Sequence, residues 1–318
     1  MPGSHRSTTI NPDWPTFGRN GPWAATQDYL HLVVQMLGKI RVGLASPLPE
    51  WGHTPLALTG RGLTTRPSPW QDGSIEARLD LFDAVVRLES SDGRSRTIQL
   101  APARPIAELW SALTGSLGEL DVAIAMWDKP QERTDVMPFS EDHRPRSLDP
   151  DLARSWFRVL TDVQAIFDAW RSRFFGRSGV NFWWGGFDLT VTLFNGRHAV
   201  PRPGSNYLMR YDLDADHVSV GFWPGDEAHE AMFFGYVVPE PPGCAVYPLS
   251  VSGADWVTTM REWVLSYESV RTAPDRSALV RQFADTILRV ASELGAWDLE
   301  ALSYDPPRGR PTSPSTTT

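Results

Sequence analysis

The stretch NFWWGGFDLTVTLFNG, residues 181–196, opens with aromatic residues and two glycines and continues as a strand of alternating character. Successive side chains of a strand point to opposite faces. One face therefore carries Phe187, Leu189, Val191 and Leu193, and the other carries Asp188, Thr190, Thr192 and Phe194. We predict a strand of an antiparallel sheet, with an apolar face toward the core and a polar face that holds Asp188.

Two interpretations of that polar face stay open. An antiparallel sheet commonly exposes one face to water, so these polar side chains need no function. Large aromatic side chains often wall small-molecule pockets, and Trp183, Trp184 and Trp223 stand beside the predicted strands. These tryptophans favour a partly enclosed, concave surface.

The rest of the chain alternates helices with strands. Apolar residues at helical spacing predict a helix at 27–44, and Asp149 followed by Pro150 predicts the start of a second long helix, which ends near Gly176. A C-terminal helix is expected at 275–295, and a hairpin at 75–100 around an Asp-Gly turn. Shorter elements are predicted as strands at 55–63 and 121–127 and as helices at 104–117 and 253–265, the last with a capping box at Ser252–Asp255.

Two segments of the chain resemble each other. ARLDLFDAVVRLESSDG (77–93) shares five identities with MRYDLDADHVSVGFWPG (209–225) at an offset of 132, and PLALTG (55–60) lies over GFDLTV (186–191). We predict an α+β fold, with antiparallel sheets, long helices packed on one face and two pseudo-repeated halves in one unit. The unit spans residues 21–300, and its halves span about 22–127 and 148–272.

Composition limits the class of protein. Both ends are rich in Pro, Ser and Thr, which predicts a flexible tail at 1–20 and a disordered tail at 305–318. A net charge of −8 without an arginine run argues against a nucleic-acid surface. No apolar run approaches 18 residues and the start lacks a signal-peptide core, so we expect no membrane partner and a cytoplasmic location. The single cysteine, Cys244, excludes an internal disulfide, and the oligomeric state stays open.

The first predicted helix carries a polar stripe. Its members fall within one arc of the helix, and they are Asp28, His31, Gln35 and Lys39. A stripe that simply faces solvent explains this pattern without any function. The alternative is a stripe that lines a site, which the helix taken alone does not favour.

The motifs LHLVVQMLGKIRVGLASPLPEWGHTPLALTGRGLTT, VNFWWGGFDLTVTLFNGR, GFWPG and YVVPEPPG favour the second interpretation. Together they resemble a bacterial family of about 300-residue proteins catalogued only as a domain of unknown function, over residues 14–300. The resemblance implies a cytosolic bacterial protein and a shared fold, and it implies no known activity. The positions that match the family pattern are His31, Gln35, Gly38, Lys39, Arg41, His53, Arg61, Asp188, His217 and Glu240. Asn181 stands where the family tends to have His, which puts any catalytic role of that position in doubt.

Known catalytic signatures are absent: there is no P-loop, dinucleotide fingerprint, nucleophile elbow or paired cysteine motif. A metal site assembled from distant residues is chemically allowed, because imidazoles and carboxylates suit zinc, iron or manganese. Its ligands would come from His31, His53, His217, Asp188 and Glu240. Close-spaced ligand pairs are missing, so we predict no metal ligands, and the cofactor is unknown.

Three functions stay open. The first is a metal-independent general acid/base enzyme acting on a small polar or anionic substrate; the second is a non-catalytic ligand-binding protein; the third is a structural or partner-interaction protein. A metal-dependent enzyme is a further alternative. For the enzyme, the predicted catalytic residues are His31, Asp188 and His217. The predicted substrate-binding residues are Gln35, Lys39, Arg41, His53, Arg61, Trp183, Trp184, Trp223 and Glu240.

Two expectations about these residues are specific. Asp188 should pair with a basic residue, preferably Arg61 or Lys39, because an unpaired carboxylate beside apolar residues is costly or becomes protonated. His31 should transfer the proton, and its replacement by Ala should leave the fold intact, because a residue on the polar arc contributes little to the core.

Overall fold

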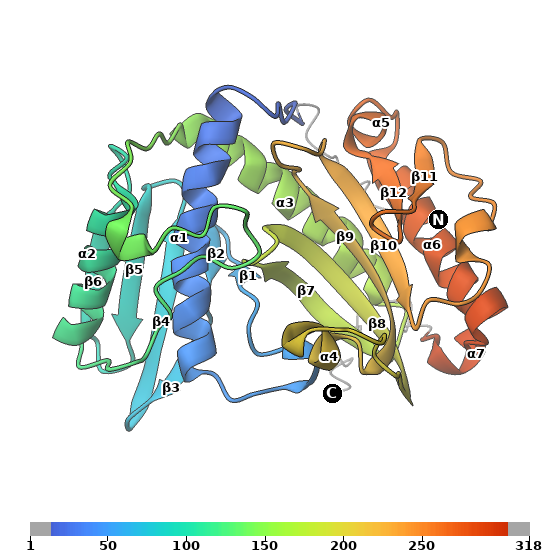
Figure 1. The fold of residues 1–318 in the computed structure, drawn as a ribbon, viewed down its shortest axis with the longest axis horizontal. Coiled ribbons are helices and arrows are strands. Elements are labelled where there is room, and N and C mark those ends of the chain that lie inside the picture. The colour runs from blue at the N-terminus through green and yellow to red at the C-terminus, as the bar shows by residue number, and fades with distance from the viewer. Residues whose placement is uncertain (1–13, 305–318) are drawn as a thin grey trace, which may run out of the picture.

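A computed structural model describes residues 14–304, which form two antiparallel sheets and several helices. The first sheet lies at the left of Figure 1 and the second at the right, and helix α1 (Pro22–Leu44) crosses the first sheet, where it contacts β3 and β4. The chain therefore has an α+β fold with antiparallel sheets, as predicted.

The first sheet is built from residues 57–99. Its strand order is β1-β2-β4-β5-β6, and β3 pairs with β4 at the side. The strands are β1 (Ala57–Leu58), β2 (Gly62–Thr64), β3 (Ser68–Trp70), β4 (Gly73–Asp80), β5 (Val85–Ser90) and β6 (Ser95–Gln99). Helix α2 (Ile106–Glu119) follows and packs near β6.

The second sheet has the order β11-β12-β10-β9-β8-β7. Its strands are β7 (Arg177–Trp183), β8 (Asp188–His198), β9 (Ala215–Trp223), β10 (Met232–Val238), β11 (Ala254–Val257) and β12 (Glu262–Ser266). Two long helices, α3 (Pro150–Arg171) and α6 (Arg276–Gly295), contact it, and Figure 1 shows α3 behind its strands. Short helices α4 (Tyr207–Asp212), α5 (Tyr267–Arg271) and α7 (Leu299–Leu302), with the 3-10 turns η1 (Pro49–Trp51), η2 (Phe139–Glu141) and η3 (Cys244–Val246), complete the fold.

The two sheets meet at one residue pair. Leu56 and Phe182 exchange both backbone hydrogen bonds, of 2.9 and 3.0 Å, so β7 lies beside the edge of the first sheet. Both side chains are fully buried, and the apolar core is continuous across this junction. Burying an aromatic side chain of this size stabilises the fold by about 2–3 kcal/mol.

The alternation predicted for residues 188–194 is confirmed. Leu189, Val191 and Leu193 are buried in the core. Because apolar side chains alternate in the same way along β9 and β10, the second sheet has one apolar face, covered by helices, and one polar face. A single layer of long helices on one face is not confirmed, since α1 packs beside β3 and β4 of the first sheet.

Several boundaries differ from the predictions. The long helices are confirmed at 22–44, 150–171 and 276–295, and Asp149 accepts the backbone N–H groups of Asp151 and Leu152, as an N-cap does. The strand predicted at 121–127 is wrong, because those residues lie outside both sheets. The helix predicted at 253–265 is also wrong: it is the hairpin β11–β12, favoured by the cross-strand contact of Trp256 with Trp263 at 4.9 Å.

The register of the predicted repeat is not confirmed. Residues 77–80 lie in strand β4, whereas residues 209–212, over which they were placed, lie in helix α4. Residues 57–58 form a two-residue edge strand, whereas 188–198 form an eleven-residue strand inside the second sheet. Amphipathic segments alternate polar and apolar residues even when they are unrelated, so the two segments can resemble each other by chance. Packing then decides which structure each segment adopts.

The core begins before the predicted boundary at residue 20. Trp14 is buried and stacks on Tyr267 at 5.5 Å, and Phe17 packs on Trp23 at 4.7 Å. The predicted tails at residues 1–13 and 305–318 lie outside the described residues. Among residues 14–304, no helix combines the length and apolar character that a bilayer span requires.

Candidate functional site

The turn between β7 and β8 explains the position of Asp188. Phe187 adopts a left-handed backbone conformation, with φ of 63°, which costs a non-glycine residue about 1–2 kcal/mol. Its ring stacks on Trp156 at 4.8 Å and is buried in the core. Because Phe187 is anchored on the apolar side, Asp188 emerges on the polar face, paired in register with Trp183.

Asp188 lies beside a second carboxyl group, that of Glu132. A Cβ atom added to Gly186 would lie 2.5 Å from Oδ1 of Asp188 and 3.9 Å from Oε2 of Glu132. A Cβ atom added to Gly185 would overlap the Glu132 carboxyl group itself. The two glycines of the WWGGF motif therefore make room for both acids, and Glu132 also has a left-handed backbone, with φ of 54°.

The expected pairing of Asp188 with a base is wrong. Arg61 forms ion pairs with Asp80 and Asp83, and Lys39 donates to the side chain of Gln131. Burial raises the pKa of Asp188 well above its ordinary value, and the charge of Glu132 raises it further. Partial desolvation by the surrounding chain also raises the pKa of Glu132, although this residue is exposed at the surface. The sequence analysis allowed for an unpaired carboxyl group that becomes protonated. The raised pKa of Asp188 corresponds to that alternative.

Two further carboxyl groups add to this cluster. Asp212, at the end of α4, has a pKa raised to about 6 by burial and by the charge of Glu132. Glu262, at the start of β12, has a pKa raised to about 7 by burial. We call Glu132, Asp188, Asp212 and Glu262 the acidic cluster. Within residues 14–304, none of these four side chains forms an ion pair or a hydrogen bond with another residue.

The polar face continues across the sheet as hydroxyl and aromatic groups. Thr192 and Ser219 share a hydrogen bond of 3.3 Å, and Trp183 donates to the hydroxyl of Thr190 at 2.7 Å. Burial raises the pKa of the Tyr236 hydroxyl, and the charges of Asp212, Glu262 and Asp188 add to that effect. Tyr236 therefore stays a neutral phenol that borders the acidic cluster.

His217 lies on the same face and is only 3% exposed. Its ring sits between those of Phe194 and Tyr236, at 5.8 and 5.7 Å. Nδ1 lies 2.9 Å from the carbonyl of Ala215, and burial lowers the pKa of the ring. A neutral imidazole that donates from Nδ1 leaves Nε2 as an acceptor.

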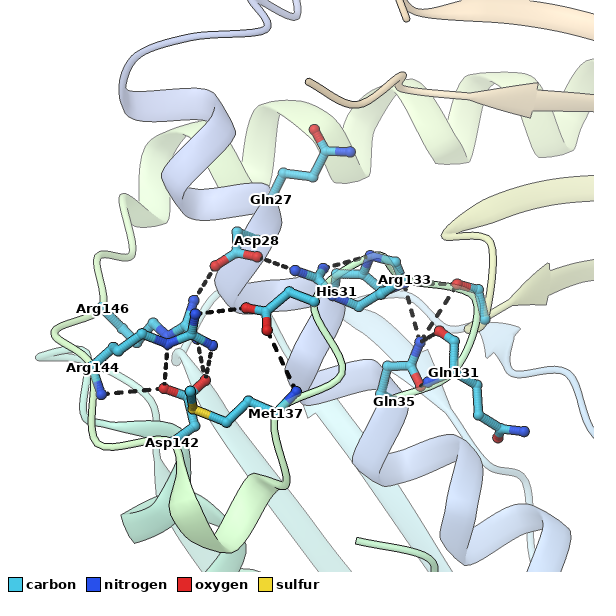
Figure 2. Close-up of polar contacts among 12 residues, drawn as sticks. Gln27, Asp28, His31, Gln35, Gln131, Arg133, Met137, Asp142, Arg144 and Arg146 are labelled. Atoms are coloured by element: carbon cyan, nitrogen blue, oxygen red, sulfur yellow. Dashed lines mark hydrogen bonds and ion pairs between the residues drawn. The ribbon is translucent and has the colours of Figure 1, made fainter. Parts of the chain in front are cut away.

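The polar stripe of α1 does not face solvent. His31 contacts the carbonyl of Gly185 through Nε2 at 2.8 Å and Arg133 through Nδ1 at 3.1 Å. Gln35 donates to the carbonyl of Gln131 and accepts from its backbone N–H. These contacts, shown in Figure 2, hold residues 131–133 against the turn of β7–β8. They thereby position Glu132.

The same stripe anchors a chain of ion pairs. Figure 2 shows Asp28 between Arg133 and Arg146, and Asp142 beside Arg146 and Arg144. Burial raises the pKa of Asp142, but hydrogen bonds from Arg144 and Arg146 outweigh it and bring the pKa to about 2. This network, which we call the arginine clamp, ties residues 133–146 to α1.

His31 is poorly suited to take up a proton at neutral pH. Burial, followed by the positive charge of Arg133, lowers its pKa to about 4. With its proton on Nε2, it donates to Gly185 and accepts from Arg133, so both ring nitrogens are occupied.

The remaining predicted residues separate into two groups. Lys39, 5% exposed, lies among the rings of Trp127, Phe139 and Trp184, and burial lowers its pKa to about 8. Trp184 donates to the carbonyl of Thr54, and its ring occupies the space beside Gly38. Both lie close to the β7–β8 turn.

The other group forms its polar contacts with residues outside the acidic cluster, although two of its members border the cluster. The register of β8 and β9 places Trp223 opposite Asp188, and Arg202, which pairs with Glu240, acts on the pKa of Glu262. Glu240 pairs with Arg202 and Arg261, and the ring of Trp223 contacts that of His229. Nδ1 of His53 accepts the N–H of Leu48, and Arg41 donates to Ser68. Arg61 belongs to the first sheet, where it pairs with Asp80.

Sequence reasoning missed Glu132, Asp212, Glu262 and Tyr236. The alternation in MFFGYVV puts Tyr236 on the face of Phe234, so that residue carried a readable signal. Glu132 lies in a segment without regular structure, and Glu262 lies in a segment predicted as a helix. Their approach to Asp188 depends on long-range packing.

Comparisons with known proteins assign the chain to a family but give no activity for it. The model of a family of unknown function (DUF5996) matches residues 14–304. No curated protein and no solved structure matches the chain. Among residues 14–304, no group of three or more His, Cys, Asp or Glu side chains is arranged to hold a metal ion.

Proposed function

The chain belongs to the DUF5996 family, whose function is unknown, and we propose that it is a small-molecule-binding enzyme in which Glu132 and Asp188 act as general acid and base. The observation that carries this proposal is the approach of these two carboxyl groups without any basic partner. An ion pair would have fixed both as carboxylates. Two acids near each other instead oppose each other's ionisation.

The chemistry follows from electrostatics. Ionising the second carboxyl group of a close pair places like charges together, so one group stays protonated over a range of pH in which the other is ionised. The protonated group donates to a substrate and the ionised group accepts from it. The apparent pKa values belong to the pair, so we assign the two roles to Glu132 and Asp188 jointly.

The surroundings support a small polar substrate. Trp183 and Tyr236 offer apolar ring faces, and Thr192 and Ser219 offer hydroxyl groups on the same face of the sheet. Ionised carboxylates accept hydrogen bonds and donate none, so the acidic cluster favours hydroxyl or ammonium groups of a ligand. His217, with Nε2 without a partner in the described chain, is the second acceptor that we propose there.

In this proposal His31 positions the residues that flank the carboxyl pair, and it does not transfer protons. Its contacts hold the Gly185 carbonyl and Arg133, which flank the carboxyl pair in space and in sequence. We further propose, from the acidic composition and the resemblance to a bacterial family, that the protein works in the bacterial cytoplasm and binds neither nucleic acid nor membrane. An internal duplication that relates the two halves also stays a proposal.

A metabolite screen tests the enzyme. Purified protein is incubated with a panel of small polar metabolites, and proton NMR follows their consumption by the wild type, Asp188→Asn and Glu132→Gln. We expect the wild type to consume one compound class and each variant to be slower by about 100-fold or more. Glu119→Gln, which removes an exposed carboxylate paired with Arg96, is the control and should keep full activity.

Two outcomes separate the alternatives. Equal turnover by the wild type and both variants would contradict the roles of Glu132 and Asp188. Binding that Asp188→Asn abolishes, with no turnover by the wild type of any bound compound, would replace the enzyme with a non-catalytic binding protein.

A further inference from the structure

Two arginines at the junction of the sheets have no carboxylate partner. Arg41, in the last turn of α1, donates through Nη1 to Ser68 at 2.9 Å, and its buried Nε has no acceptor. The guanidinium group of Arg66, between β2 and β3, has no hydrogen-bond or ion-pair partner within residues 14–304. Most guanidinium groups of this acidic protein do pair, as the arginine clamp illustrates.

The backbone holds Arg66 in place. Its N–H donates to Thr64 at 2.8 Å, and its carbonyl accepts from Thr65 at 3.1 Å and from Ser68 at 3.5 Å. Because Ser68 also accepts from Arg41, one hydroxyl links the two arginines. They are close enough for the charge of Arg66 to lower the pKa of Arg41, after the larger effect of burial.

Asn181 adds an unused amide group beside them. Its side chain is only 9% exposed and forms no hydrogen bond within the described chain. A Cβ atom added to Gly179 would lie 3.5 Å from Oδ1 of Asn181 and 3.9 Å from Nη2 of Arg66, so amide and guanidinium lie on the same side of β7. The amide of Asn181 is therefore free to bind a ligand without breaking a contact within the described chain.

We propose that Arg41, Arg66 and Asn181 bind the oxyanion group of a small ligand, a carboxylate or a phosphate. Two guanidinium groups with no counter-ion provide the donors that such groups accept in paired, charge-assisted hydrogen bonds. The side-chain amide of Asn181 supplies a further donor. This site does not depend on the proposed acid and base chemistry, because none of its residues belongs to the acidic cluster.

His53 lies at the edge of the same site. The charge of Arg41 helps to lower its pKa, after burial, and Nδ1 accepts the N–H of Leu48. The neutral ring therefore carries its proton on Nε2, a donor that has no partner in the described part of the chain. His53 thus adds a neutral donor near Arg41.

Thermal unfolding with inorganic phosphate and with acetate tests the site. Each anion is titrated at constant ionic strength, with potassium chloride as the reference. We expect at least one of the two anions to raise the melting temperature above the chloride reference, and the effective one identifies the source of the oxyanion. The dissociation constant should rise at least about tenfold in Arg66→Gln, which removes one charged donor.

Two variants make the test sharper. Asn181→Ala should weaken binding less than Arg66→Gln, because it removes a neutral donor. Arg158→Gln is the control, since Arg158 likewise forms no ion pair within residues 14–304 and donates only to the hydroxyl of Ser155, and it should bind as the wild type does. Stabilisation by neither anion, or equal stabilisation of the wild type and Arg66→Gln, would overturn the proposal.

Discussion

The arginine clamp and the acidic cluster meet at two consecutive residues, Arg133 of the clamp and Glu132 of the cluster, and their carboxyl groups behave in opposite ways. In the clamp, Asp142 is buried beside two guanidinium groups and its pKa falls to about 2. In the acidic cluster, Asp212 and Glu262 are partly buried without such partners, and their pKa values rise to about 6 and about 7. Burial acts in the same direction in both places, so the presence of a partner decides the sign.

This contrast distinguishes a network that stabilises the fold from a group of residues that we assign to a functional site. The clamp satisfies its charges internally and fixes residues 133–146 on α1. The acidic cluster leaves its charges unsatisfied and contains Glu132 in a left-handed conformation. Strained or unpaired groups lower the stability of the fold and are found mostly at functional sites. The acidic cluster has both features and therefore supports the proposed function.

The largest effect is expected in the clamp. Arg146→Ala removes a side chain that is 9% exposed and contacts both Asp28 and Asp142, so two partly buried carboxylates lose a partner. We expect the free energy of unfolding to fall by about 3 kcal/mol, measured by urea denaturation. Arg154→Ala, which breaks an exposed pair with Asp151, is the control and should cost less than about 1 kcal/mol. Equal, small losses in both variants would show that the clamp does not stabilise the segment.

A smaller effect of opposite sign is expected in the acidic cluster. The pKa of Glu262 is about 7 in the folded protein, above its ordinary value of 4.5, so the folded state holds the proton more tightly than the unfolded state. Stability is therefore lost as the pH rises from about 4.5 to about 7, and Glu262→Gln should escape that loss. Because Glu262 is partly exposed, we expect the variant to gain about 1 kcal/mol over the wild type between these pH values. A stability difference that does not change with pH would contradict the raised pKa.

The sequence predicted those features of the two regions that depend on local residue patterns. The alternation at 188–194 placed Asp188 on a polar face, and Asp149 with Pro150 marked the start of α3. It also placed His31, Gln35 and Lys39 on one side of α1, but not against residues 131–133, because nothing local encodes which segment covers a helix.

Glu132 could not be predicted as the neighbour of Asp188 for a similar reason. Glu132 precedes Asp188 by 56 positions in the chain and lies in a segment without regular structure, so its approach is set by the clamp and by the room at Gly185 and Gly186. General electrostatics led to the prediction of a basic partner, since an unpaired buried carboxylate is unfavourable. The structure shows the unfavourable arrangement, and the proposed function rests on that departure from the general rule.

The most direct test of the account is the pKa of Asp188, measured by carbon-13 NMR titration of its carboxyl carbon in the wild type and in Glu132→Gln. We predict a midpoint well above the ordinary value of 3.8 in the wild type, because of burial and the charge of Glu132. In Glu132→Gln the midpoint should fall but stay raised, since the variant removes the neighbouring charge and keeps the burial. A wild-type midpoint near 3.8, or one that Glu132→Gln leaves unchanged, would contradict the claim that these two acids form a coupled pair.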